Sequence, residues 1–257
     1  LVRTDSSTDS LTINSVIGGS GGITKTGAGT LTVGSGTNTF TGNIFINQGV
    51  FAFTTSYNNL DSNTSLGAAG ARNIYLNGGT FKNASGATFN PAASTKVINV
   101  QLAGGTVDLN GQQFQLDDAS QLAGAGNLTL TNTSASAGTT LLGASAVGYT
   151  SFTGNLLVTA PSGSITLKLA NANAAGNNGT NIVLGANAAL DLQATINNNV
   201  YVGGTGIASA GAVISSATGG GVASGYTVNL TSSTKLGNAN QLTFSGNIVD
   251  NGGNYLL

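Results

Sequence analysis

The sequence of 257 residues contains no cysteine, histidine, methionine or tryptophan, and all eight of its acidic residues are aspartate. Without histidine and cysteine, a serine–histidine triad, a cysteine nucleophile and a typical zinc site are excluded. The absence of cysteine also excludes a disulfide framework. Only 6% of the residues are charged, whereas an average soluble protein has about 25%. The seven Lys and Arg residues are spread singly, so no basic patch for nucleic acid is present.

Good helix-forming residues are also scarce, because glutamate and methionine are absent and lysine and arginine are few. No apolar run approaches the roughly 20 residues that span a bilayer, so we expect no membrane insertion by this segment. The chain is nevertheless 40% hydrophobic with a net charge of −1, which is not the composition of a disordered protein. It can therefore bury a core, and its low charge permits copies to associate.

What the chain has in abundance is glycine, asparagine, serine and threonine between short apolar segments. Many segments alternate apolar and polar residues with period two, as half-buried strands do, and Gly, Asn or Ser clusters flank them. The predicted strands include Leu11–Ile13, Thr30–Val33, Ile44–Ile46, Asn73–Leu76, Thr106–Leu109, Asn127–Leu130, Ile165–Leu167, Ile182–Leu184, Leu190–Leu192, Tyr226–Leu230 and Leu242–Phe244.

Two architectures accommodate many short strands: an antiparallel sandwich or barrel, and a parallel β-solenoid. The solenoid is favoured because two-residue hairpin turns are few and charge on the strand faces is scarce. Asparagine and small residues at the turns also suit ladders in which like groups hydrogen-bond from coil to coil. We therefore predict an all-β fold with one continuous, elongated solenoid domain over residues 1–257.

One segment, within residues 18–51, is much more specific than the rest. It reads GGITKTGAGTLTV at Gly21–Val33, NTFTGNI at Asn38–Ile44 and NQGVF at Asn47–Phe51. This segment resembles the autotransporter-associated β-strand repeat, also called the passenger-associated transport repeat, with Phe40 where tyrosine is usual. The resemblance implies a right-handed parallel β-helix in a large secreted or surface-anchored bacterial protein. We expect an outer-membrane anchor to lie outside this chain.

The beginning of the chain recurs in part near its end, at residues 242–257. Leu11-Thr12-Ile13-Asn14, Ile17 and Gly21-Gly22 are matched at a constant offset by Leu242-Thr243-Phe244-Ser245, Ile248 and Gly252-Gly253. Two interpretations stay open: blocks of a tandem array, or two ends of a subunit that meet in a polymer. Since the chain starts at Leu1, we expect a processed form or a segment of a longer product.

The terminal coils of a solenoid expose strand edges and apolar core, which natural proteins cover with caps, proline or charge. No charge-rich cap is visible at Asn247–Leu257. We therefore predict that both ends are assembly surfaces, covered by copies of this protein or by adjoining blocks of a longer chain. The candidate residues are Leu11, Ile13, Ile17, Leu242, Phe244, Ile248, Tyr255, Leu256 and Leu257.

Parallel β-helices also include polysaccharide-degrading enzymes, so the carboxylates need consideration. Asp117 and Asp118 are the only adjacent acids, and the nearest basic residue in sequence is Lys96. Neighbours on a strand point to opposite faces, so a solvated turn is favoured over a catalytic or Ca²⁺-binding pair. The sequence predicts no enzyme, no cofactor and no metal site.

Lys25 and the aromatic residues of the first coils have structural and functional interpretations. We predict that Lys25 lies along the outer face with its amine on a turn carbonyl, while contact with a glycan or partner is the alternative. Phe45, Phe51, Phe53 and Tyr57 lie close in sequence and could form a sugar-stacking strip, but packing in the core of the first coils explains most of them better.

The sequence thus predicts an extracellular or cell-surface β-solenoid that stacks end to end into a surface fibre or long rod. The first alternative is an adhesin or glycan-binding autotransporter-like passenger that uses the rod as a stalk, with surface glycans as partners. The second, less favoured alternative is a polysaccharide-degrading enzyme. A nucleic-acid partner is not expected.

Overall fold

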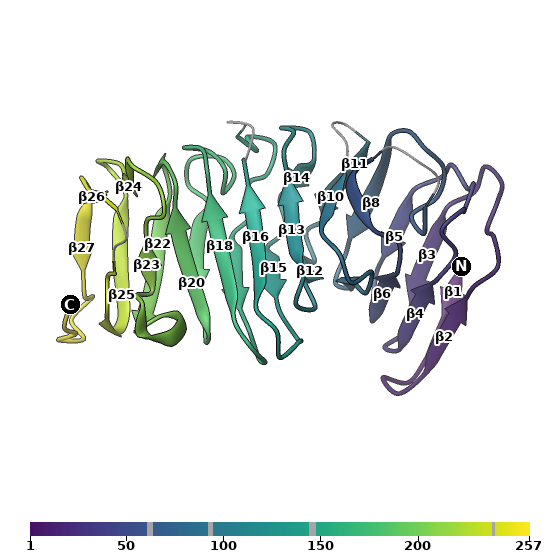
Figure 1. The fold of residues 1–257 in the computed structure, drawn as a ribbon, viewed down its shortest axis with the longest axis horizontal. Helices are drawn as coiled ribbons and strands as arrows, with labels where there is room; N and C mark the ends of the chain where they lie inside the picture. The colour runs from purple at the N-terminus through teal and green to yellow at the C-terminus, as the bar shows by residue number, and fades with distance from the viewer. Residues whose placement is uncertain (61–63, 92–94, 144–147, 238–239) are drawn as a thin grey trace.

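The computed structural model describes residues 1–60, 64–91, 95–143, 148–237 and 240–257. In these residues the strands form four sheets, which we name A to D, and every pairing between named strands is parallel. Successive strands follow one another along the long axis of the molecule, from the N-terminus at one end to the C-terminus at the other (Figure 1). The predicted parallel β-solenoid is confirmed.

The strands of each sheet, in the order in which they are hydrogen-bonded, are as follows. Sheet A contains β1 (Val2–Arg3), β3 (Ile23–Thr26), β5 (Ile44–Ile46), β8 (Arg72–Leu76), β11 (Lys96–Val100) and β14 (Leu122–Gly124). Sheet B contains β2 (Ser10–Ile13), β4 (Thr30–Val33), β6 (Val50–Phe53), β9 (Thr80–Asn83), β12 (Gly105–Asp108), β15 (Leu128–Thr131), β17 (Leu156–Thr159), β19 (Asn181–Leu184), β22 (Asn199–Gly204), β25 (Thr227–Thr234) and β27 (Asn247–Val249). Sheet C contains β23 (Val213–Ile214), β20 (Ala188–Leu192), β18 (Ile165–Leu169), β16 (Gly138–Leu142), β13 (Gln113–Leu116), β10 (Phe89–Pro91) and β7 (Tyr57–Leu60). Sheet D contains β21 (Thr195–Ile196), β24 (Gly220–Val222) and β26 (Leu242–Phe244), and a short 3-10 helix, η1, spans Ile207–Ser209.

The chain visits the faces of the solenoid in a fixed order. A full coil passes through sheet A, then sheet B, then sheet C, and sheet D takes the place of sheet A in the last coils. Coil length is not constant: Val183 pairs with Tyr201, 18 residues later, whereas Val50 pairs with Thr80, 30 residues later. The extra residues lie between the strands, so the sheets stay in register.

The predicted period-two alternation positions the core. In β18 the residues Ile165, Leu167 and Leu169 are buried and the intervening Thr166 and Lys168 are only partly covered. Because parallel pairing aligns each residue with its counterpart one coil later, the inward side chains form continuous apolar columns. One hydrophobic cluster therefore runs through the solenoid.

Aromatic stacking holds the coils of the first half together. Phe81 stacks on Phe53 with ring centroids 4.7 Å apart, and Phe89 stacks on Phe114 at 5.1 Å. The prediction that Phe51 and Phe53 belong to the core is confirmed, since both are fully buried. Phe45 is the exception among them, since it is 38% exposed and stacks on Tyr75 on the outer face of sheet A. The side chain of Tyr57 lies outside the described part.

An asparagine ladder lines one edge of sheet B, as the turn composition predicts. Asn155 N donates to Asn127 Oδ1 at 3.0 Å, and Asn181 N donates to Asn155 Oδ1 at the same distance. Asn199 Nδ2 then donates to Asn181 Oδ1, and Thr227 N donates to Asn199 Oδ1. Each coil thereby satisfies a turn N–H or an amide of the next coil, which fixes the register at the strand entrance.

The prediction for Lys25 needs correction in one respect. Lys25 points inward with Ile23, because both occupy the same face of β3, and its side chain is buried rather than on the outer face. Its amine does bind turn carbonyls, donating to the oxygens of Thr26 at 2.7 Å and Gly27 at 2.6 Å. Burial lowers the pKa of the Lys25 amine. Gly49, with φ of +68°, leaves room for it, since a Cβ there would lie 2.8 Å from Lys25 Nζ.

Tyr149 provides a prediction of pH dependence. Its hydroxyl is buried, donates to the Leu116 carbonyl and accepts from Gly143 N. Burial raises the pKa of this hydroxyl above its usual value, so the unfolded chain loses the proton first as the pH rises. The contribution of the neutral hydroxyl to stability is therefore complete below about pH 10 and is lost above it, by about 1.4 kcal/mol per pH unit.

We expect the stability difference between the wild type and Tyr149→Phe to change in the same window. The free energy of unfolding, measured in guanidinium between pH 8 and pH 11, should fall more steeply above pH 10 for the wild type than for the variant. The variant has no hydroxyl at position 149 that could ionise. Parallel pH profiles of the two proteins would contradict the assignment.

Candidate assembly surfaces at the ends of the solenoid

The N-terminal end of the solenoid is an open strand edge. β2 is the first strand of sheet B and pairs only with β4. Leu11, Leu31 and Phe51 are aligned in one inward column, and their exposed fractions are 41%, 0% and 0%. Leu11 is exposed only because no described coil precedes it. Ile13 and Ile17 are partly buried and pack against the core beside it.

The C-terminal end has the same character. β27 pairs only with β25, and β26 pairs only with β24, so each leaves one edge open. Ile248 continues the column of the buried Val200 and Val228 but is itself only partly buried. Leu242 and Phe244 of β26 likewise pack against the core while staying partly exposed.

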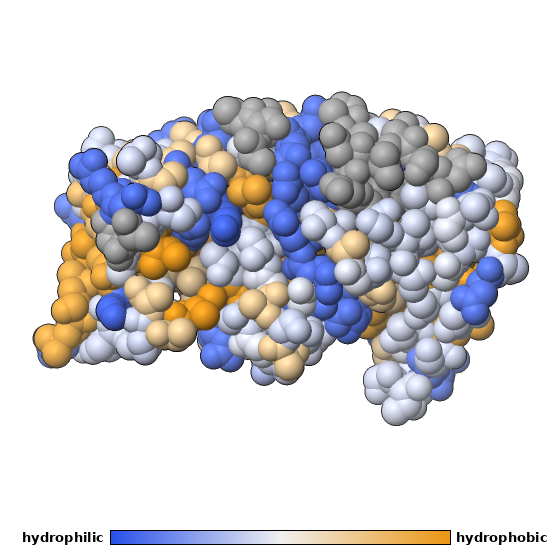
Figure 2. Space-filling model, viewed as in Figure 1, coloured by the Kyte–Doolittle hydropathy of each residue, from blue (hydrophilic) through white to orange (hydrophobic). Residues whose placement is uncertain are grey.

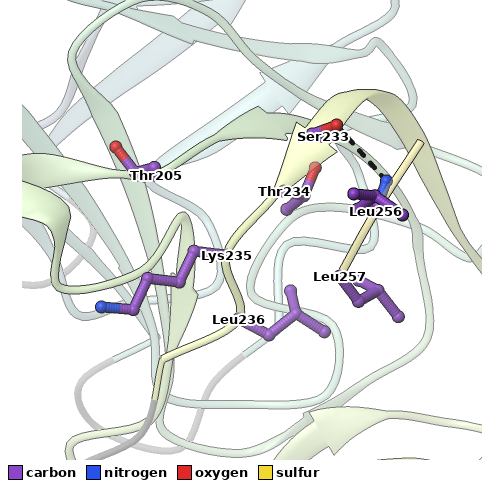
Figure 3. A pocket seen from close by; sticks show the side chains of 7 residues that line it. All are labelled: Thr205, Ser233, Thr234, Lys235, Leu236, Leu256 and Leu257. Atoms are coloured by element: carbon purple, nitrogen blue, oxygen red, sulfur yellow. Dashed lines mark hydrogen bonds between the residues drawn. The ribbon is translucent and has the colours of Figure 1, made fainter.

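The last residues fold back over this end. Thr234 N donates to the Leu256 carbonyl at 2.8 Å. Leu256 N donates to Ser233 Oγ at 3.3 Å, the bond drawn in Figure 3. These bonds join the tail to the last two residues of β25, yet Leu256 and Leu257 remain 74% and 68% exposed.

Two hollows lie on either side of this tail, of about 360 and 480 Å³. The first is lined in part by Lys235 and Leu236, which Figure 3 shows near Leu257. The second is lined in part by Ile248 and Tyr255. Leu256 and Leu257 border both, so the tail forms an apolar ridge between two hollows.

Charge is sparse on this end. Among residues 240–257 the only charged side chain is Asp250, which accepts from Gly252 N and Asn254 N within its own turn. Figure 2 shows a continuous hydrophobic zone at the C-terminal end. An exposed apolar surface with open strand edges and little charge is typical of a surface that binds another protein element.

The structure thus separates the predicted assembly residues into two groups. Leu11, Ile13 and Ile17 lie at one end, and the other six lie at the opposite end. Sequence reasoning missed Leu236, which bridges Val213 and closes sheet C at the C-terminal end. Its signal was weak, since Leu236 stands next to lysine outside any alternating segment.

The segment near the C-terminus that resembles the first residues in sequence does not occupy the equivalent place in the fold. Leu11–Ile13 lies in β2 of sheet B, whereas Leu242–Phe244 forms β26 of sheet D. The two segments therefore face different sides of the solenoid. The order of the sheets does not support an interpretation as equivalent strands of tandem blocks.

The acidic pair has a structural role in the turn after β13. The backbone N–H groups of Asp117 and Asp118 both donate to Gln121 Oε1, at 2.7 and 2.9 Å. The Asp118 carboxylate accepts from Ser120 N, and the Asp117 carboxylate accepts from Asn90 Nδ2. The predicted turn is confirmed. Within the described ranges no cluster of three or more metal-binding side chains is found, nor any helix long and apolar enough to cross a membrane.

Comparison with known proteins agrees with this fold. Residues 23–52 match the passenger-associated-transport-repeat family. The matched segment extends from β3 into β6 and so includes two successive strands of sheet A and two of sheet B. The predicted resemblance of this segment to the family repeat is confirmed, and the match spans residues 23–52. No solved structure is significantly similar to the chain.

A curated relative shares a longer segment. The adhesin BmaC autotransporter of Brucella suis biovar 1 (strain 1330) is 37% identical over 105 residues, which is 41% of this chain and 3% of the relative. The matched part is thus a small fraction of that protein. The repeat at residues 23–52, the segment shared with the Brucella adhesin and the parallel coils together make this chain similar to autotransporter passenger proteins.

Proposed function

We propose that this solenoid is a structural rod, displayed at a bacterial cell surface, whose two ends stack on further solenoid coils. The observation that carries the proposal is the exposure of apolar core columns at both ends. In an end-to-end contact, the open edges of β26 and β27 meet the open edges of β1 and β2, and Leu256 and Leu257 are covered. Because the two ends differ, such a contact is heterologous and extends into a fibre.

Display outside the cell is supported by the repeat and by the similarity to an autotransporter. A surface of threonine, serine, asparagine and glycine with few charges is consistent with this location. The role proposed for the rod is mechanical and requires no catalysis.

Substitution at each end tests the stacking. We expect the wild-type chain to form end-to-end oligomers in sedimentation velocity and short fibres in negative-stain images. Leu11→Asp and Leu256→Asp should each give a monomer, because each places a charge on one of the two stacking surfaces and prevents the end-to-end contact. The substituted side chains are already exposed in the isolated chain, so thermal unfolding should change little.

Mixing the variants makes the test specific. The Leu11→Asp chain keeps its C-terminal end and the Leu256→Asp chain keeps its N-terminal end, so an equimolar mixture should give heterodimers and nothing longer. Leu102→Asp is the matched control, because Leu102 is 87% exposed on the side of the rod. A wild-type chain that stays monomeric at high concentration, or an equal effect of Leu102→Asp, would overturn the proposal.

An adhesive role is the second candidate, favoured by the identity shared with the Brucella adhesin. In this case the rod carries a binding surface on its side or presents one at its tip. Beads coated with the chain should bind to epithelial cells more than albumin-coated beads do. Equal binding of the two kinds of bead would argue against adhesion by this segment.

A further inference from the structure

In the described part of the chain, six of the seven basic side chains form an ion pair or a hydrogen bond within the protein, and one does not. Arg3 and Lys82 pair with Asp5 and Asp108. The other occupied basic groups donate to backbone carbonyls: Lys25, Arg72, Lys96 and Lys235. Lys168 is the exception, since its amine has neither a hydrogen bond nor a carboxylate within 4.0 Å in the described part of the chain.

Lys168 lies in a polar groove on the outer face of sheet C. The groove measures about 310 Å³. It crosses four consecutive coils, from β13 through β16 and β18 to the residues after β20. A hydrophilic band crosses the middle of this face over β13 (Figure 2). The side chains that give the groove its chemistry are Gln112, Gln113, Thr139, Leu141, Lys168 and Gln193.

The nearest acid along the sheet is already satisfied. Asp191 pairs with Lys168 in the strand register, but it is buried and turned to other partners. Its carboxylate accepts from Ser216 N at 2.8 Å, from Ser216 Oγ at 2.6 Å and from Gln193 Nε2 at 3.4 Å. Asp191 lowers the local positive potential, yet it leaves the donors of the Lys168 amine available.

The surroundings favour a saccharide over a peptide. Peptides that bind as an added strand need a free sheet edge, and β16 and β18 are paired on both sides. Among the described residues that line the groove, none is aromatic and could hold an apolar anchor. It offers amides and a hydroxyl in successive coils about 4.8 Å apart, which can exchange hydrogen bonds with the hydroxyls of an extended sugar chain.

The geometry points to a binding site for an acidic oligosaccharide along sheet C, with the sugar carboxylate on the Lys168 amine. Gln113 Nε2 donates to Gln115 Oε1, and Gln193 Nε2 donates to Ser216 Oγ and Asp191 Oδ2. The Oε1 atoms of Gln113 and Gln193 therefore accept from sugar hydroxyls, beside the Thr139 hydroxyl, and Leu141 contacts the C–H face of a ring. This site is on the side of the rod and is independent of the stacking at its ends.

Calorimetric titration with defined sugars tests the site. The probes are tetragalacturonate and an α2,8-linked tetramer of sialic acid, each beside its carboxyl-reduced form. We expect at least one acidic probe to bind and its reduced form to bind at least tenfold more weakly, because a hydrogen bond to a charged group is lost. Lys168→Gln should lower the affinity for the acidic probe by the same factor.

Lys235→Gln is the matched control, since it removes the same charge at a distance from the groove. It should leave binding unchanged, and Lys168→Gln should leave sedimentation unchanged. Failure of both acidic probes to bind would overturn the inference, as would an equal loss in the two lysine variants. A hexaglutamate peptide that binds as tightly and loses affinity in Lys168→Gln would show that the groove accepts acidic chains in general, which also overturns it.

Discussion

Phe81→Ala is expected to lower the free energy of unfolding by about 3–5 kcal/mol, which is typical of removing a buried aromatic side chain. Phe81 is fully buried at the centre of an aromatic cluster. Its ring stacks on Phe53 at 4.7 Å and meets the edge of Phe89 at 5.5 Å. Since β9 pairs with β6 on one side and with β12 on the other, the loss weakens contacts in both directions along the solenoid. Chemical denaturation measured by circular dichroism provides the value.

Phe45→Ala is the matched control for this experiment. Phe45 belongs to a stacked pair of the same geometry, with Tyr75 at 4.7 Å, but it lies on the outer face. We expect its loss to cost about 1 kcal/mol, the order of an exposed aromatic pair. A similar cost for Phe45→Ala and Phe81→Ala would mean that the inner cluster contributes no more than surface stacking.

Arg72→Leu is the other substitution with a large expected effect, about 3–5 kcal/mol of destabilisation. The guanidinium is buried and donates to the carbonyls of Phe40 and Ala68, both at 2.7 Å, and it lies 5.5 Å from the centre of the Phe40 ring. Without Arg72 the Phe40 carbonyl keeps Ala68 N as a donor at 3.0 Å, whereas the Leu66 and Ala68 carbonyls lose the guanidinium. Each buried carbonyl left without a donor costs about 1–3 kcal/mol. Leucine fills part of the space but satisfies none of these oxygens.

The effect of Arg72→Leu should be local as well as large. Ala68 belongs to the turn that lengthens the coil between β6 and β9, so hydrogen exchange should accelerate in the described residues 64–70. Arg3→Leu is the control, because Arg3 is exposed and its ion-pair partner among the described residues is the equally exposed Asp5. A solvent-exposed pair of this kind contributes little to stability. Equal destabilisation by the two variants would show that the buried hydrogen bonds of Arg72 do not stabilise the turn.

These expectations follow from the way a solenoid is stabilised. Each coil contacts mainly its neighbours, so stability is close to a sum of coil energies and interfaces between adjacent coils. An internal coil has two such interfaces, while a terminal coil has one. Phe81 lies in an internal coil with a neighbour on each side, so its loss weakens two interfaces. Leu11 and Leu256 lie in terminal coils with one neighbour each and are therefore exposed, which motivates the proposal that further coils cover them.

The strand positions could be predicted because period two is a local property. The alternation in Ile165–Leu169 follows from adjacent residues alone, and the structure confirms a strand there. The asparagine ladder was also accessible, since asparagine recurs at the turns and identical groups hydrogen-bond across coils. Strands without clear alternation, such as β6 with Val50–Phe53, were harder to place by pattern alone and depended on the resemblance to the family repeat.

The candidate sites were less accessible to sequence reasoning. The direction of Lys25 was predicted incorrectly because an isolated lysine is normally solvated, and only the converging carbonyls of Thr26 and Gly27 make burial acceptable. The groove beside Lys168 was missed because its residues are separated by more than twenty positions between coils.

The sequence by itself determined the class of this protein: short parallel strands, turns of asparagine and glycine, and the repeat at residues 23–52. Only the tertiary structure decided which residues meet, because coil lengths vary from 18 to 32 residues between paired positions. A single extra residue reverses every later side chain, so the register cannot be counted along the chain. Coil stacking decides it, by aligning apolar columns inside and leaving their last residues exposed at the two ends.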